Sequence, residues 1–211
     1  KIPIFYHEEL TPEKILEFKP DIMIVVGYRK LFSNQILSIP RHGVLGLHAS
    51  LLPNLRGQAP LNWSIINGHE KTGITLFKMD EGIDTGDIIG QKEITIEKNE
   101  TIVEIKNKIR KLAVQLIEEY IPSILSGNGV FIKQSKNGTY GSARIPDDGK
   151  INWNFSTKKI YNLIRGSESS YAAFTFFNSK KLYIKKASLL DDEIFFGTPG
   201  QVCMTYRDGS V

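Results

Sequence analysis

An α/β fold with a layered sheet is the fold class that the sequence predicts, followed by a smaller β-rich part. Over residues 1–134, short apolar runs alternate with stretches of helical periodicity, which is the pattern of a sheet covered by helices. The run at residues 21–26 is almost entirely apolar and ends at Gly27, as in a parallel strand buried on both faces. From residue 135 the chain becomes polar and glycine-rich, and strand-like segments follow.

The elements of the first part follow in chain order. Residues 2–6 form a short apolar run that predicts a strand. Thr11, Pro12 and Glu13 predict the start of a helix, because a capping residue, a proline and an acid stand at its first positions. Three further strands are expected at residues 43–47, 72–79 and 88–96.

The longest helix is expected over residues 99–125. Thr101 and Glu104 have the spacing of a capping box at its start. Pro122 is expected to end or kink the helix, with Gly127 as its outer limit. Apolar residues at helical spacing predict one buried face: Ile105, Ile109, Leu112, Leu116 and Tyr120.

The last third of the chain divides differently. Residues 135–149 are rich in glycine and polar residues and are interpreted as a linker. A helix is expected over residues 157–165, and strands over residues 181–190 and 201–206. These patterns predict a first domain at residues 1–134 and the beginning of a β-rich domain at residues 150–211.

Composition and charge restrict the class of protein. The chain has 211 residues, of which 41% are hydrophobic and 24% charged, so it is globular rather than disordered. The net charge is +4, which is compatible with a tRNA partner but does not indicate one. No apolar run is long enough to cross a bilayer. The single cysteine, Cys203, excludes an internal disulfide and weakly favours a reducing compartment.

His48 stands where an α/β sheet places functional side chains. It follows the expected strand at residues 43–47, and ligands in such folds bind at the carboxyl ends of strands. A histidine that only caps the strand by hydrogen bonding is the alternative. Position alone leaves both interpretations open.

Two loops carry further polar residues. Residues 80–87 hold four acids among glycines, which suits either a ligand-binding loop or a solvated turn. The acids do not have the spacing of an EF-hand, so no metal site is predicted. Arg56 and Gly57 are candidates for binding an anion, although an exposed arginine is more often ordinary surface.

Taken together, these segments resemble a known family. Residues 46–57, Gly-Leu-His-Ala-Ser-Leu-Leu-Pro-Asn-Leu-Arg-Gly, resemble the Asn-x-His-x-Ser-Leu-Leu-Pro-x-x-Arg-Gly signature of 10-formyltetrahydrofolate-dependent formyltransferases. Residues 59–63 and 72–76 continue the match, and residues 79–88 resemble the second signature loop. This family includes glycinamide ribonucleotide, methionyl-tRNA and sugar-nucleotide formyltransferases. The resemblance implies a Rossmann-like catalytic domain and a C-terminal open β-barrel.

The resemblance also implies catalytic roles. An amine attacks the formyl carbon of 10-formyltetrahydrofolate, His48 donates to the developing oxyanion, and Asp84 favours a protonated imidazole and accepts or relays the amine proton. The family's catalytic Asn falls at Gly46, which has no side-chain amide. Three readings follow for Gly46: a weakened or inactive enzyme, a donor supplied from elsewhere, or a changed residue.

Binding residues come from the resemblance as well. Folate is expected between the segments 28–31 and 79–84. The implied folate-binding residues are Tyr28, Arg29, Leu31, Ile36, Met79, Glu81, Gly82 and Ile83. The implied residues for the second substrate are Ser50, Arg56 and Gly57. Ile36, Leu31 and Met79 have ordinary core packing as their alternative.

The acceptor amine is expected to belong to an amino-sugar nucleotide. Residues 27–31 and 59–63 look most like sugar-nucleotide formyltransferases, in particular the domain that formylates UDP-4-amino-4-deoxy-L-arabinose. Methionyl-tRNA formyltransferase is the second reading, and a non-catalytic folate- or nucleotide-binding homologue, suggested by Gly46, is the third. The resemblance implies a cytoplasmic protein that is not membrane-bound, and leaves its oligomeric state open. The family's first strand–helix–strand unit is absent before residue 1, so the sequence is expected to be part of a longer protein.

Overall fold

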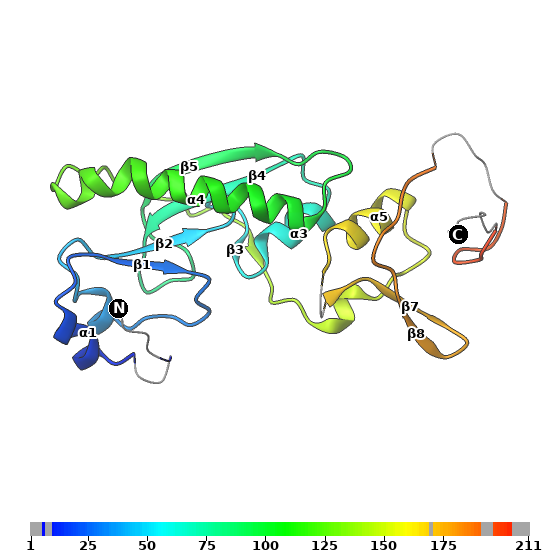
Figure 1. Ribbon diagram of the computed structural model, residues 1–211, viewed down its shortest axis with the longest axis horizontal. Helices are drawn as coiled ribbons and strands as arrows, with labels where there is room; N and C mark the ends of the chain where they lie inside the picture. Colours follow the sequence, from blue (N-terminus) through cyan, green and yellow to red (C-terminus); the bar gives the residue numbers. More distant parts are fainter. Residues whose placement is uncertain (1–5, 7–9, 169–170, 191–195, 204–211) are drawn as a thin grey trace.

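A four-stranded mixed sheet forms the centre of the computed structural model, which describes residues 6, 10–168, 171–190 and 196–203. The strands are β1 (Met23–Val26), β2 (Val44–His48), β4 (Lys71–Lys78) and β5 (Ile88–Thr95), in the spatial order β1-β2-β4-β5 (Figure 1). β1 and β2 are parallel, whereas β4 pairs with β2 and β5 in antiparallel fashion. The predicted α/β class and the three strands after β1 are confirmed.

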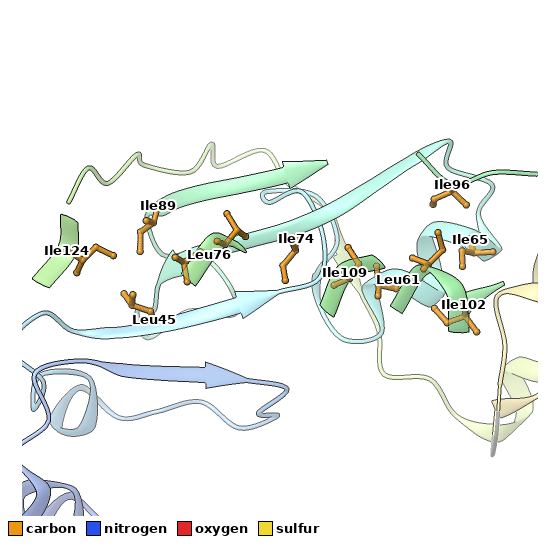
Figure 2. Packing of buried hydrophobic residues seen from close by; sticks show 12 residues of the cluster. Leu45, Leu61, Ile65, Ile74, Leu76, Ile89, Ile96, Ile102, Ile109 and Ile124 are labelled. Atoms are coloured by element: carbon orange, nitrogen blue, oxygen red, sulfur yellow. The ribbon is translucent and has the colours of Figure 1, made fainter. Parts of the chain in front are cut away.

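The main core lies between this sheet and the helix α4 (Ile102–Leu125). Leu45, Leu76 and Ile89 point from the strands into this core, as Figure 2 shows. The helix α3 (Pro60–Ile66) adds Leu61 and Ile65. The predicted apolar stripe of α4 is confirmed, since all its members are buried in this core or packed against it: Ile105, Ile109, Leu112, Leu116 and Tyr120.

The ends of α4 follow the predicted signals. The Glu104 carboxylate accepts the Thr101 N–H at 2.7 Å, and this hydrogen bond holds the pKa of Glu104 below its usual value. Pro122 does not end the helix as one expectation had it, because α4 continues to Leu125, and the expected kink remains a prediction; Gly127 follows in the left-handed region. Among the helices of the described residues, none is long and apolar enough to cross a membrane.

Two short helices precede β2. α1 (Pro12–Phe18) begins after Thr11, whose side chain accepts the Lys14 N–H at 3.3 Å, as predicted for this helix start. α2 (Asn34–Leu37) is a single turn between β1 and β2. The strand predicted at residues 2–6 lies outside the described residues except for Tyr6.

The prediction that β1 is buried on both faces is wrong. Ile24 and Val26 are 40% and 69% exposed. They pair with Leu45 and Leu47 and therefore lie on the face of the sheet that α4 covers elsewhere. α4 packs over β4 and β5, so its cover does not extend to β1 at the sheet edge. The apolar run identified a strand, but burial also depends on what packs over it.

The C-terminal part contains a helix and a hairpin. The 3-10 helix η2 (Pro146–Gly149) leads to α5 (Thr157–Arg165), which has the predicted bounds. β7 (Phe174–Phe177) and β8 (Lys180–Tyr183) form an antiparallel hairpin that sequence analysis placed only in part. Asn178 and Ser179 both have positive φ, which fits a two-residue type I′ turn.

The expected strand at residues 181–190 is therefore too long, because β8 ends at Tyr183. Residues 201–203 carry no strand, and the remainder of the segment 201–206 lies outside the described residues. Within the described part of the chain the C-terminal strands form no closed barrel.

Contacts between α3 and α5 join the two parts of the molecule. The Asn62 side-chain amide donates to the Gly166 carbonyl at 2.8 Å, and the Trp63 indole donates to the Ser142 carbonyl at 2.8 Å. The Arg165 guanidinium donates to the carbonyl of Glu100 at 2.8 Å, just before α4. The domain boundaries at residues 134 and 150 remain predictions.

Truncation of a core side chain on α4 tests the packing that supports the sheet. Leu116 is fully buried, so Leu116→Ala should lower the free energy of unfolding by about 2–5 kcal/mol. Val114 is 54% exposed on the same helix, so Val114→Ala should change it little. Urea unfolding measures both, and equal losses in the two variants would contradict the assigned helix face.

Candidate functional site

His48 and Asp84 meet on the side of the sheet that faces away from α4. His48 is the last residue of β2 and is 8% exposed, whereas Asp84 lies in the loop between β4 and β5. The distance from His48 Nδ1 to Asp84 Oδ2 is 3.5 Å. The structure therefore brings together the two side chains to which the sequence assigned the chemistry.

The two ring nitrogens of His48 have different partners. Nε2 lies 2.7 Å from the Leu55 carbonyl oxygen, which can only accept a hydrogen bond. Nε2 therefore carries a proton, and Nδ1 is the nitrogen turned toward Asp84. A proton on Nδ1 would complete an imidazolium beside a carboxylate, which is a favourable charge pair.

Backbone groups fix the position of the Asp84 carboxylate. The Gly57 N–H donates to Asp84 Oδ2 at 2.7 Å. Asp84 itself has φ of 52°, in the left-handed region that aspartate tolerates better than most residues. Such a conformation persists only where the surroundings hold it, and it occurs often at functional sites.

The rest of the acidic loop is a tight turn. Asp80 Oδ1 accepts the Gly82 N–H at 3.1 Å and the Thr85 hydroxyl at 2.7 Å. A Cβ at Gly86 would lie 1.7 Å from the Lys78 carbonyl oxygen, so only glycine fits there. Asp80 thus stabilises the loop that presents Asp84. Among the described residues, no cluster of three or more His, Cys, Asp or Glu side chains is arranged to hold a metal ion.

The loop after β2 is partly buried and is held by hydroxyl groups. The Ser50 hydroxyl donates to the Asn54 carbonyl at 2.6 Å, within the loop that contains the cis Leu52–Pro53 bond. Thr75 is fully buried; its hydroxyl donates to the Ser50 carbonyl at 2.7 Å and accepts the Leu52 N–H at 3.1 Å. Sequence analysis did not single out Thr75. The expected contact of Ser50 with substrate remains a prediction.

Arg56 is buried, so the alternative that it is an ordinary exposed surface arginine is wrong, and anion binding by Arg56 and Gly57 remains a prediction. Its side chain donates to Gln134 Oε1 at 2.9 and 3.1 Å, to the Ser135 carbonyl at 3.0 Å and to the Tyr140 hydroxyl at 3.2 Å. The structure thus gives Arg56 internal partners, and Gly57 holds Asp84 through its backbone. Gln134 belongs to no motif, so only the three-dimensional structure places it here.

The predicted folate-binding residues lie on two segments. After β1, Tyr28 stacks on Phe32 with ring centroids 4.5 Å apart, and burial raises the pKa of the Tyr28 hydroxyl. After β4, Met79 is half-buried. The other predicted residues are placed as follows: Ile36 and Gly82 are half-buried, and Arg29, Leu31, Glu81 and Ile83 are exposed. Folate binding by these residues remains a prediction.

The space beside Gly46 is filled by an aromatic ring. Gly46 pairs with Phe77, next to a register shift between Leu76 and Phe77. A Cβ at Gly46 would lie 2.5 Å from Phe77 Cε1 and 3.2 Å from Met79 Cγ. Bulges re-aim side chains, and here the Phe77 ring takes the place that a side chain at position 46 would need. Sequence analysis did not single out Phe77.

Comparison with known proteins matches most of the chain. Residues 6–121 match the formyl transferase family, and residues 145–211 match the formyl transferase C-terminal domain. The chain is 40% identical to methionyl-tRNA formyltransferase of Thermodesulfovibrio yellowstonii, over 85% of this chain and 58% of that protein. It is 37% identical to the bifunctional polymyxin resistance protein ArnA of Wigglesworthia glossinidia brevipalpis, over 96% of this chain and 32% of that protein.

A solved structure shares the fold. The sugar 3-N-formyltransferase WlaRD, determined with dTDP and 5-N-formyltetrahydrofolate, superposes with a TM-score of 0.70 at 21% identity, over 87% of this chain and 68% of that one. The chain spans only 58% of the length of its methionyl-tRNA formyltransferase relative from Thermodesulfovibrio. On the matched family models, which cover both parts of the molecule, the chain belongs to the formyl transferase family.

Proposed function

We propose that the chain transfers a formyl group from 10-formyltetrahydrofolate to an amine, at the His48–Asp84 pair. The observation that carries this proposal is the 3.5 Å approach of His48 Nδ1 to Asp84 Oδ2, with both side chains held by backbone hydrogen bonds. Enzymes of this family use 10-formyltetrahydrofolate as the formyl donor. Their fold, with folate bound, is represented among the solved structures.

The chemistry follows from the positions of the polar atoms. The amine nitrogen attacks the formyl carbon and loses a proton. The bond from that carbon to the folate nitrogen then breaks, and the folate nitrogen takes up a proton as tetrahydrofolate leaves. Because Nε2 of His48 is bonded to the Leu55 carbonyl, Nδ1 is the nitrogen assigned to the reaction. Protonated Nδ1 donates to the formyl oxygen as negative charge develops there, and Asp84 accepts or relays the amine proton. Alignment of the two substrates contributes much of the remaining rate.

An amino-sugar nucleotide is the acceptor that we propose first. The run at residues 59–63 supports it by its resemblance to sugar-nucleotide enzymes, and the small net charge of +4 suits a nucleotide diphosphate. In this chain Asn62 and Trp63 bond to the C-terminal part, so their contribution to a sugar site is indirect. A cytoplasmic location belongs to the same proposal.

Methionyl-tRNA is the second candidate, and one surface favours it. Lysines lie over aromatic rings on the C-terminal part, with Lys159 Nζ 3.8 Å from the Phe155 ring and Lys150 Nζ 5.9 Å from the Phe176 ring. Phe176 and Phe177, on the same hairpin, are more than half exposed. Cationic groups interleaved with exposed aromatic rings suit the phosphates and bases of a nucleic acid. The 40% identity to a methionyl-tRNA formyltransferase agrees with this candidate.

A substrate panel tests the reaction and separates the acceptors. The chain is mixed with 10-formyltetrahydrofolate and either amino-sugar nucleotides or methionyl-tRNA, and tetrahydrofolate release is followed. We expect release with an amino-sugar nucleotide, reduced about 10²–10⁴-fold in His48→Ala and Asp84→Asn because each variant removes a proton-transfer group. His69 is exposed in the turn between α3 and β4, so His69→Ala is the matched control.

The other outcomes are equally distinct. Release only with methionyl-tRNA, weakening steeply as salt is raised, would move the protein to the second candidate. Full activity in His48→Ala would exclude the assigned centre. Folate binding without release to any amine would indicate a non-catalytic binding protein.

Substitution at Gly46 tests whether the site lacks a donor. Gly46→Asn alone should lower the free energy of unfolding by about 1–3 kcal/mol, because the new side chain meets the Phe77 ring. The double variant Gly46→Asn, Phe77→Val makes room, and its loss of stability should be smaller than the sum of the single losses. If the formyl oxygen lacks a donor, the double variant should release tetrahydrofolate up to about 10²–10³-fold faster than Phe77→Val alone.

Urea unfolding measures the loss of stability, and tetrahydrofolate release measures the effect of the added amide on the reaction. Unchanged stability in Gly46→Asn would show that the Phe77 ring does not restrict position 46. A stable double variant without faster release would show that no donor is missing.

A further inference from the structure

The segment 134–141, most of which was interpreted as a linker, contacts both loops that hold the catalytic pair. β6 (Tyr140–Gly141) pairs in parallel with β3 (Arg56–Gly57). The Arg56 N–H donates to the Thr139 carbonyl at 2.9 Å, and the Gln58 N–H donates to the Gly141 carbonyl at 2.8 Å. The connection between the two parts of the molecule is thus docked along the loop that follows β2.

Gln134 joins this loop to the Asp84 loop. Its side-chain N–H groups donate to the carbonyl oxygens of Asp84 at 2.9 Å and Gly86 at 2.7 Å. Its Oε1 accepts two hydrogen bonds from Arg56, at 2.9 and 3.1 Å. Hydrogen bonds in series polarise one another, so the buried guanidinium strengthens the donation from the amide to the Asp84 loop.

Thr139 supports the other half of the pair. Its hydroxyl accepts the Leu55 N–H at 2.8 Å. The carbonyl of the same Leu55 receives the His48 Nε2 hydrogen at 2.7 Å. A shift of Leu55 would therefore rotate or release the imidazole ring.

We infer that Gln134 and Thr139 are positioning residues that fix Asp84 and His48 in register with each other. This inference rests on the proposed function, since it assigns a purpose to the geometry of the proposed catalytic pair. Neither residue contacts a reacting atom. Gln134 acts through the backbone carbonyls of Asp84 and Gly86, and Thr139 acts through the N–H of Leu55.

Two substitutions at Gln134 separate its two hydrogen-bonding sides. Gln134→Met keeps the shape and removes both sides. Gln134→Glu keeps an acceptor for Arg56 but loses the donors to Asp84 and Gly86. We expect kcat to fall by about 10²-fold in both variants, because a small displacement of a catalytic group has an effect of that size. The dissociation constant for folate should change less than about threefold. Gln115 is exposed on α4, so Gln115→Met is the matched control.

A measurement without turnover makes the inference independent of the reaction. The Gly57 N–H is bonded to Asp84 Oδ2, so its hydrogen exchange reports the position of that carboxylate. Gln134→Met should accelerate exchange at Gly57, and Thr139→Val should do the same at the Leu55 amide. Thr139→Val also serves if a Gln134 variant fails to fold.

The outcomes distinguish this inference from the proposed function. If the parent chain is active, and Gln134→Met changes neither kcat nor the hydrogen exchange at Gly57, the inference is overturned. Full activity in Gln134→Glu would also overturn it. A parent chain with no formyl transfer to any amine, but faster Gly57 exchange in Gln134→Met, would remove the proposed function and retain the positioning role.

Discussion

The irregular loop that follows β2 is partly buried at Ser50, Leu52 and Leu55, and the backbone polar groups of these residues must find partners inside the protein. An unpaired buried N–H or C=O costs about 1–3 kcal/mol, so each such group has to be accounted for. The Ser50 carbonyl and the Leu52 N–H bond to the Thr75 hydroxyl, and the Leu52 carbonyl accepts from Gln91 at 2.8 Å. The carbonyl of Leu55 is satisfied by His48 itself. The hydrogen bond that satisfies the Leu55 carbonyl therefore also orients the imidazole ring of His48.

The sheet separates packing from chemistry by alternation of its side chains. Leu45 on β2 and Leu76 on β4 point toward α4. His48 and Thr75, which pair directly on the same two strands, occupy the alternate positions and point to the opposite face. A slip of one residue in this register would turn both sets of side chains over. The packing of α4 on one face of the sheet thus fixes which residues face the proposed site, although the hydrogen bonds to His48 and Asp84 come from Leu55, Gly57 and Gln134 and not from α4.

Sequence could predict the parts of this structure that depend on local pattern. Periodicity placed α4 and three central strands, and the signature resemblance identified His48 and Asp84. Exposure of Ile24 depends on the reach of a helix some 80 positions later, and Gln134 lies 50 positions from the carbonyl it holds. The overlap of Phe77 with the space at Gly46 requires both the strand register and its irregularity. Such long-range relations leave no signal in a single sequence.

A docked connection changes how an acceptor held by the C-terminal part would meet the proposed catalytic pair. A flexible glycine-rich spacer would leave the two parts at a broad range of separations and lower the effective concentration of one relative to the other. Here Thr139 is bonded to the loop after β2, Ser142 to Trp63, and Arg165 to the segment before α4. These contacts are formed before any substrate arrives, so less ordering is required on binding. An amine anchored near α5 or the β7–β8 hairpin would then approach His48 and Asp84 from one defined direction, whichever acceptor carries it.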